Sequence, residues 1–151
     1  MKKEISASYT EQVQILNQSN INGFKRLFGG QLMQWIDIVA AVTARRHSEH
    51  NVTTVLVDRL EFKKPAKAND TILLTGHVEY VGCTSMEVCV NTYIEELSGE
   101  KTLINTAHLV MVALDENDRP TEVPGLILKT EKERSDWEAA RLRREVRITL
   151  S

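Results

Sequence analysis

The chain has 151 residues, of which 42% are apolar and 26% charged, and its formal net charge is −2. This balance predicts one globular domain spanning 1–151 and excludes a general electrostatic attraction to nucleic acid. No apolar run has the length of a membrane span, and the first residues, MKKEISASYTEQ, lack the apolar segment of a signal peptide, so we expect a cytoplasmic protein without a membrane partner.

The N-terminal third predicts a strand, a loop and a long helix. Residues 3–16 mix polar and β-branched side chains and predict the strand, and residues 17–28 predict a polar loop. Gly29 and Gly30 permit tight backbone at the entrance of the helix. Over 31–47 apolar residues recur at helical spacing and occupy nearly every face, so the helix is predicted to be buried nearly all round.

The rest of the chain predicts four strands and a surface helix. Alternating apolar residues place the strands at 52–62, 71–81, 84–97 and 102–114. Turn residues between them, such as Ser98-Gly99, predict an antiparallel meander. A loop over 115–125 precedes a charged helix over 130–147, whose one large apolar anchor is Trp137. Cys83 and Cys89 are expected to be reduced thiols that fill space.

This order of elements predicts an α+β fold. One long apolar helix needs a surface that encloses it, and a curved antiparallel sheet supplies that surface. The opposite face of so apolar a sheet indicates association with a second copy of the chain.

Seven short motifs occur in a fixed order, and together they resemble the hotdog-fold acyl-CoA thioesterases, specifically the bacterial branch related to cytosolic acyl-CoA hydrolases. The motifs are N-x-x-G at Asn20–Gly23, LFGG at Leu27–Gly30, QWID ending at Asp37, ARRH at Ala44–His47, EFKKP at Glu61–Pro65, VGCTSMEV at Val81–Val88 and VALDENDRPTEVP at Val112–Pro124.

The resemblance implies hydrolysis of acyl-CoA to a free acid and CoA. It implies no cofactor, because coenzyme A is part of the substrate and the product. It also implies the hotdog fold and a homo-oligomer of hotdog dimers, with a trimer of dimers as one arrangement. A non-catalytic acyl-CoA sensor on the same fold is the alternative, although the sequence has no helix-turn-helix or basic region to serve as its output.

Asp37 is the one carboxylate that interrupts the apolar helix. A buried carboxylate is costly unless it is partnered or neutral, and desolvation raises the proton affinity of the carboxylate, which suits a general base that activates water. Direct attack on the thioester carbonyl is the other catalytic route open to Asp37. The non-catalytic alternative is a solvated acid on an exposed stripe of the helix. The resemblance points to Asp37 as the catalytic carboxylate.

The resemblance also implies a catalytic asparagine from the loop before the helix, contributed across a dimer interface. The loop is read as two residues longer than the family pattern, so matching N-x-x-G selects Asn20, whereas counting back from Gly30 selects Asn22. We prefer Asn20, because an insertion is easily accommodated in a loop, whereas choosing Asn22 would mean that the N-x-x-G motif is lost. Either asparagine also fits the role of a turn former.

The entrance of the helix fits an oxyanion site. The first N–H groups of a helix have no intrahelical partner, and glycines let a substrate approach them, so Phe28, Gly29, Gly30 and Gln31 are candidates, with a plain tight turn as the alternative. Further candidates for substrate contacts are Arg45, Arg46, His47, Phe62, Lys64, Gly82, Thr84 and Ser85. Related sequences commonly have arginine where this chain has Cys83, so no guanidinium contact is expected there.

Other catalytic constellations are missing from the sequence. His47 and His50 have a metal-pair spacing, but no nearby residues complete a ligand set, so no metal is expected. His77 and His108 fall in predicted strands and are interpreted as sheet residues. The G-x-S-x-G elbow of a Ser-His-Asp hydrolase does not occur.

Overall fold

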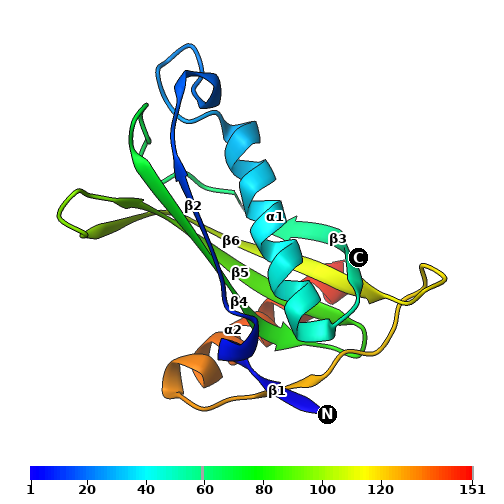
Figure 1. The fold of residues 1–151 in the computed structure, drawn as a ribbon. Helices are drawn as coiled ribbons and strands as arrows, with labels where there is room; N and C mark the ends of the chain where they lie inside the picture. The colour runs from blue at the N-terminus through cyan, green and yellow to red at the C-terminus, as the bar shows by residue number, and fades with distance from the viewer. Residues whose placement is uncertain (59, 151) are drawn as a thin grey trace.

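A computed structural model describes residues 1–58 and 60–150 of the chain. A five-stranded antiparallel sheet curves around the long helix α1, and the C-terminal helix α2 lies on the opposite face of the sheet (Figure 1). The elements are β1 Lys2–Glu4, a 3₁₀ turn Ile5–Ser8, β2 Thr10–Ile15, a 3₁₀ turn Gln18–Asn20, α1 Gly29–Ser48, β3 Asn51–Asp58, β4 Thr71–Val81, β5 Ser85–Glu95, β6 Lys101–Leu114, β7 Gly125–Ile127 and α2 Glu131–Leu150.

This arrangement confirms the α+β hotdog architecture expected from the sequence, with its central helix, curved antiparallel sheet and C-terminal surface helix. Among the described residues, no helix combines the length and the apolar character that crossing a membrane requires. A single domain over 1–151 stays a prediction, and residue 151 lies outside the described part of the chain.

The order of strands in the sheet is β2-β4-β5-β6-β3. Strands β4, β5 and β6 form the expected meander, but β3 pairs with β6 at the far edge, so the prediction of four strands in one meander is wrong for β3. The connection from β3 to β4 contains Pro65 and is too long for a hairpin, and on its way Lys63 N–H donates to the carbonyl of Ile104 (2.8 Å). The strand predicted over 52–62 ends at Asp58 in the structure; position 59 lies outside the described residues, and 60–62 are not strand.

The segment predicted as one strand over 3–16 is divided in two. Strand β1 pairs in parallel with β7, and the 3₁₀ turn after β1 buries Ile5. Strand β2 then pairs with β4, at the edge of the five-stranded sheet opposite β3. Strand β7 was not predicted, because three residues that follow two prolines carry no strand periodicity of their own.

Helix α1 packs on the concave face of the sheet at close range. A Cβ atom added to Gly76 of β4 would lie 2.6 Å from Thr43 Oγ1 and 2.8 Å from Val39 Cγ1, so only glycine lets the strand and the helix approach this closely. The buried residues of the helix on this side include Leu32, Ile36, Val39, Ala40 and Ala44.

One stripe of α1 remains open, which corrects the expectation of burial all round. Gly30, Gln34 and Ile38 lie on it, and Ile38 is 47% exposed. Five strands cover only one side of the helix, so even an apolar side chain on the opposite side stays exposed in a single chain. Asp37 is half-buried at the border of this open stripe.

Helix α2 is held against the outer face of the sheet partly by an aromatic contact. The rings of Trp137 on α2 and Tyr80 on β4 have centroids 5.1 Å apart. Trp137 is therefore the anchor that the sequence predicted.

Lys25 is the strained residue of the loop before α1. Its φ is 61°, a left-handed conformation that costs a non-glycine residue about 1–2 kcal/mol. We expect Lys25→Gly to raise the melting temperature by about 2–4 °C per kcal/mol gained, measured by thermal unfolding. Lys67→Gly is the matched control, since Lys67 is also exposed but lacks a positive φ. An equal loss of stability in both variants would contradict the strain at Lys25.

Candidate active site

The N-terminus of α1 presents free backbone donors. The helix begins at Gly29, and its N-cap residue Phe28 makes no side-chain capping hydrogen bond. The N–H groups of Gly29, Gly30 and Gln31 precede the first intrahelical bond, which Leu32 N–H donates to the carbonyl of Phe28 (3.1 Å). A Cβ atom on Gly30 would lie 2.7 Å from the Phe28 ring, so a larger residue at this position would displace the ring.

A cleft of about 460 Å³ opens beside this terminus. It brings together four of the predicted site residues, Asn22, Gly29, Phe62 and Lys64. Arg26, Lys63 and Lys64 place three cationic side chains along the same walls. Sequence analysis did not select Arg26, although its position in the loop before the glycine pair was the available signal. The remaining lining residues are Leu27, Pro65 and Ala66.

The two candidate asparagines occupy different environments. Asn20 is 8% exposed, and its Oδ1 accepts from Asn17 N–H (2.9 Å) while its Nδ2 donates to Gln31 Oε1 (3.1 Å). Asn22 is exposed and lines the cleft, where its Oδ1 accepts from the N–H groups of Phe24 and Arg26. Its Nδ2 has no partner among the described residues. Since the amide of Asn20 is engaged inside the loop, the geometry favours Asn22 over our sequence-based preference.

Asp37 is held by a residue that sequence analysis missed. Thr54 Oγ1 donates to Asp37 Oδ1 at 2.6 Å and also lies 3.4 Å from Met111 Sδ. Thr54 comes from the edge strand β3, next to a β-bulge between Thr54 and Leu56. The other carboxylate oxygen, Oδ2, has no partner within the described chain. Thr54 gave no signal in the sequence, because strand periodicity does not say which residue of an edge strand meets a helix.

The predicted cations at the end of α1 lie away from the cleft. Arg45 is fifteen residues after Gly30, about 22 Å along the helix axis. Arg46 is used structurally, since its Nη1 donates to the carbonyl of Tyr9 (2.8 Å). His47 is fully buried with Nε2 at 2.8 Å from the carbonyl of Pro124, and burial lowers its pKa. The prediction of His47 as a cationic substrate contact is therefore wrong.

Gly82, Thr84 and Ser85 form the turn between β4 and β5 and line no part of the cleft. Gly82 N–H donates to the carbonyl of Ser85 (2.9 Å). The guanidinium of Arg144, on α2, lies 5.8 Å from the centroid of the Tyr80 ring and approaches Gly82. A guanidinium is thus present near this turn although the turn itself has Cys83.

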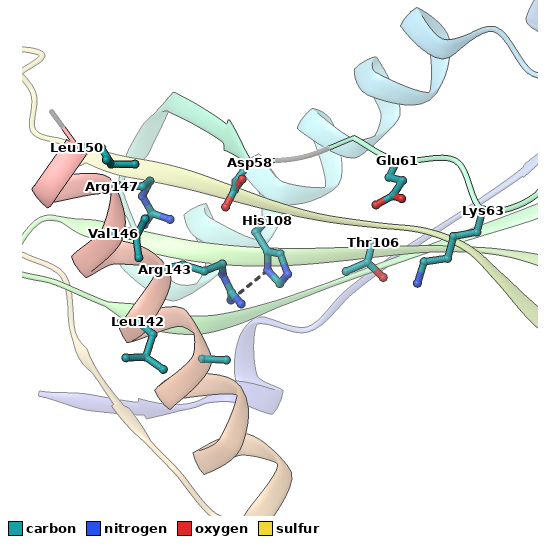
Figure 2. A pocket seen from close by; sticks show the side chains of 11 residues that line it. Asp58, Glu61, Lys63, Thr106, His108, Leu142, Arg143, Val146, Arg147 and Leu150 are labelled. Atoms are coloured by element: carbon teal, nitrogen blue, oxygen red, sulfur yellow. Dashed lines mark hydrogen bonds between the residues drawn. The ribbon is translucent and has the colours of Figure 1, made fainter.

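A second hollow, of about 760 Å³, lies on the outer face of the sheet (Figure 2). Leu142 and Val146 of α2 form one wall, and Thr106 and His108 of β6 form its floor. It contains none of the site residues predicted from the sequence, so the cleft at the α1 entrance is the candidate site.

The chain is similar to known proteins over most of its length. The model of the thioesterase superfamily matches residues 24–99. An uncharacterized acyl-CoA thioester hydrolase of Bacillus subtilis, YkhA, is 39% identical over 132 residues, which cover 87% of this chain and 75% of the relative. Protein VdlD of Helicobacter pylori is 34% identical over 122 residues, covering 80% of this chain and 70% of that protein.

Solved structures match over nearly the whole chain. A hexameric acyl-CoA thioesterase in its apo form has a TM-score of 0.94 at 36% identity, covering 98% of this chain and 96% of its own. The acyl-CoA hydrolase of Staphylococcus aureus, in complex with butyryl coenzyme A, coenzyme A and coenzyme A disulfide, has a TM-score of 0.94 at 32% identity, covering 99% and 92%.

The Staphylococcus aureus hydrolase has also been solved as three alanine variants, which replace one asparagine, one aspartate and one threonine. In that protein the aspartate lies 15 residues after the asparagine, and the threonine lies 17 residues after the aspartate.

Proposed function

Because the chain belongs to the hotdog-fold acyl-CoA thioesterases of the thioesterase superfamily, we propose that it hydrolyses acyl-CoA to a carboxylic acid and CoA with Asp37 as the general base. The observation that carries this proposal is the hydrogen bond of 2.6 Å from Thr54 to Asp37 on the border of the open stripe of α1.

The spacing of three residues supports the assignment. Asn22, Asp37 and Thr54 stand 15 and 17 residues apart in this chain, the same two intervals that separate the residues replaced in the Staphylococcus aureus hydrolase. Matching by these intervals leaves no insertion between Asn22 and Gly30. Lys25, with its positive φ, then stands where the N-x-x-G pattern has its glycine.

In the proposed mechanism Asp37 removes a proton from a water molecule, and the water oxygen attacks the carbonyl carbon of the thioester. The carbon–sulfur bond then breaks, and the protonated Asp37 returns its proton to the leaving CoA sulfur. Thr54 fixes Oδ1, which leaves Oδ2 to accept the proton without a change of rotamer. A nucleophilic role would instead require Oδ2 to move to bonding distance of the substrate, so the anchored geometry favours the base.

The entrance of α1 supplies the groups that stabilise negative charge. We assign the oxyanion to the backbone N–H groups of Gly29 and Gly30, with the free Nδ2 of Asn22 as an additional donor. Arg26, Lys63 and Lys64 are placed to attract the phosphates of coenzyme A.

These parts cannot act on one carbonyl within one chain. Asp37 lies seven residues after Gly30, about 10 Å along the axis, and the free N–H groups point away from it. A base and the carbonyl that its water attacks lie within about 6 Å of each other. We therefore propose that Asp37 of one chain faces the α1 entrance of a second chain, in a homo-oligomer of dimers such as the hexamer of the related thioesterase. The exposed side chain of Ile38 on the open stripe offers an apolar contact for the second chain.

A thiol-release assay over acyl-CoAs of increasing chain length tests the proposal directly. Steady release of CoA is expected for at least one length, and no cofactor should be needed. Saturable binding of acyl-CoA without release of the thiol would instead identify a non-catalytic sensor.

Removal of the Thr54 hydroxyl is expected to weaken catalysis without disturbing the fold. A hydrogen bond to a charged group contributes about 1.5–3 kcal/mol, so Thr54→Val should lower kcat by roughly 10- to 100-fold. Thr54→Ser keeps the donor and should retain most activity. Thr53→Val is the control, since Thr53 is exposed on the same strand without contact to Asp37. Equal kcat in the Thr54→Val and Thr53→Val variants would contradict the role of this hydroxyl.

A further inference from the structure

Three side chains able to ligate a metal form a row across the outer face of the sheet, beneath α2. His77 of β4 is the cross-strand partner of Cys89 on β5, and Cys89 is the partner of His108 on β6. Cross-strand partners lie about 5 Å apart and point to the same face. This row has no part in the cleft at the α1 entrance.

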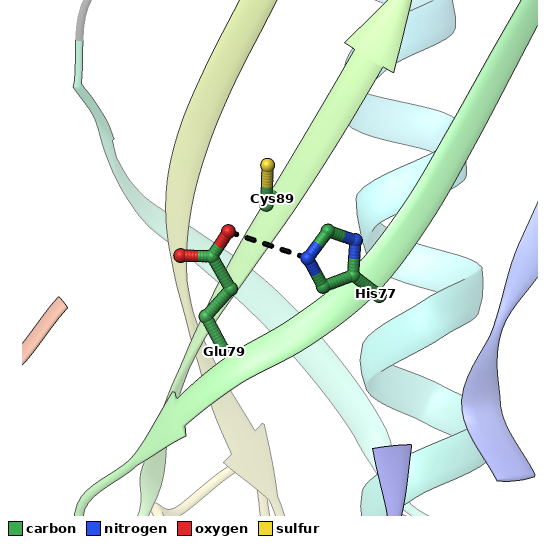
Figure 3. Close-up of side chains that lie close together, drawn as sticks. All are labelled: His77, Glu79 and Cys89. Atoms are coloured by element: carbon green, nitrogen blue, oxygen red, sulfur yellow. Dashed lines mark ion pairs between the residues drawn. The ribbon is translucent and has the colours of Figure 1, made fainter. Parts of the chain in front are cut away.

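Glu79 adds a carboxylate to the row. A β-bulge interrupts the pairing between Val78 and Tyr80, and such bulges redirect the extra residue's side chain. Glu79 is 4% exposed, and its Oε1 lies 3.3 Å from His77 Nε2. The ligand atoms of His77, Glu79 and Cys89 all lie within 4.8 Å of one another. Figure 3 shows these three side chains, with the ion pair between His77 and Glu79 as a dashed line.

Two side chains of this cluster, Glu79 and Cys89, are buried under α2 and are 4% and 3% exposed. The thiol of Cys89 donates to Asn91 Oδ1 at 3.9 Å, which is long even for sulfur, and it also hydrogen-bonds with Glu79. Both contacts are weak enough for the sulfur to become a metal ligand.

We propose that His77 Nε2, Glu79 Oε1 and Cys89 Sγ bind a divalent transition-metal cation of the zinc type. Nitrogen, sulfur and oxygen ligands together suit zinc, whereas magnesium and calcium prefer oxygen alone. Binding releases one proton from the Cys89 thiol as the sulfur–metal bond forms.

Helix α2 supplies the groups that complete this site. Asp136 Oδ2 lies 4.0 Å from His77 Nε2 and is placed to become a fourth ligand. Arg143 Nη2 donates to Glu79 Oε2 at 3.0 Å and orients the carboxylate, while Oε1 faces His77 Nε2 at 3.3 Å, so the cation would insert between Oε1 and Nε2. The metal would thus join β4, β5 and α2, a structural role separate from thioester hydrolysis.

The cation has a route from solvent. A hollow of about 400 Å³ beside α2 is lined by both His77 and Asp136. Lys132 pairs with Asp136 at 3.1 Å, but its side chain is 82% exposed, so the pair opens to water at little cost. The alternative role of the cluster is a hydrogen-bonded tether for α2 without any metal.

Cobalt substitution distinguishes these two roles. The full chain, stripped with a chelator, is titrated with Co²⁺ and followed by the thiolate-to-cobalt charge-transfer absorption. One equivalent per chain is expected to bind and to be displaced by Zn²⁺. Cys89→Ser should abolish the charge-transfer band, whereas Cys83→Ser, which removes the exposed thiol, should keep it.

A second variant covers the event that Cys89→Ser does not fold. His77→Gln should weaken cobalt affinity by more than about 10-fold, since even an outer-shell partner contributes that much, and His50→Gln should leave it unchanged. If the wild-type chain shows no thiolate-to-cobalt band, the metal site is overturned and the metal-free tether remains as the role of the cluster. A band that survives Cys89→Ser but not Cys83→Ser assigns the binding to the surface thiol and overturns it equally.

Discussion

Asp37→Asn is expected to lower kcat for acyl-CoA hydrolysis by about 10²- to 10⁴-fold, the contribution usual for a general base. Asparagine has nearly the same shape and keeps an oxygen that accepts from Thr54 Oγ1, so the 2.6 Å contact can persist. It cannot accept the proton of the attacking water. The loss should therefore fall on kcat, measured by thiol release at saturating acyl-CoA, with little change in KM.

The control for the lost charge is Glu116→Gln, because Glu116 is an exposed acid in the turn after β6, at the opposite end of α1 from the candidate cleft. This variant should match the wild type in kcat. Size-exclusion chromatography should show the same assembly for all three proteins. An Asp37→Asn protein that retains kcat within tenfold of the control would remove Asp37 from the mechanism.

A single turnover in ¹⁸O-labelled water separates the two roles of the carboxylate. If Asp37 acts as a base, the label enters the product acid alone. If it attacks the carbonyl, an anhydride forms, and hydrolysis at its aspartyl carbonyl places label in Asp37 itself, which mass spectrometry of the peptide containing Asp37 detects. Label in that peptide would overturn the assignment as a base.

Two features of the candidate site have local signals, because a single acid in an apolar helix and a glycine pair at its entrance are visible in a window of ten residues. The structure places the glycines in the first turn of α1, whereas Asp37 lies half-buried at the border of the open stripe and not in the core. The hairpin turns between β4, β5 and β6 were equally local, and those strands pair as predicted.

What the sequence could not supply depends on distant partners. Strand β3 has the same pattern whether it pairs with β4 or β6, so its position at the edge, and with it Thr54, came only from the structure. The sequence around His47 is typical of a solvated helix end. In the structure, however, His47 Nε2 lies 2.8 Å from the carbonyl oxygen of Pro124, 77 residues later in the chain. Local periodicity contains no information on either contact.

Separate measurements of activity and stability on two variants distinguish Asn20 from Asn22 as the catalytic amide. Asn22→Asp keeps an oxygen for the N–H groups of Phe24 and Arg26 but removes the free Nδ2 donor. Removal of one oxyanion donor typically costs about 10²–10³ in kcat, so this loss is expected with an unchanged melting temperature.

Asn20→Ala should show the opposite behaviour. It removes the acceptor for Asn17 N–H and the donor to Gln31 inside the loop, and an unsatisfied buried group costs about 1–3 kcal/mol. The melting temperature should therefore fall, while kcat measured well below it changes little. The reverse result, full stability with lost turnover in Asn20→Ala and an active Asn22→Asp enzyme, would restore Asn20 as the catalytic amide. It would also require the loop to rearrange when a second chain binds, because in this structure both ends of the Asn20 amide are already hydrogen-bonded.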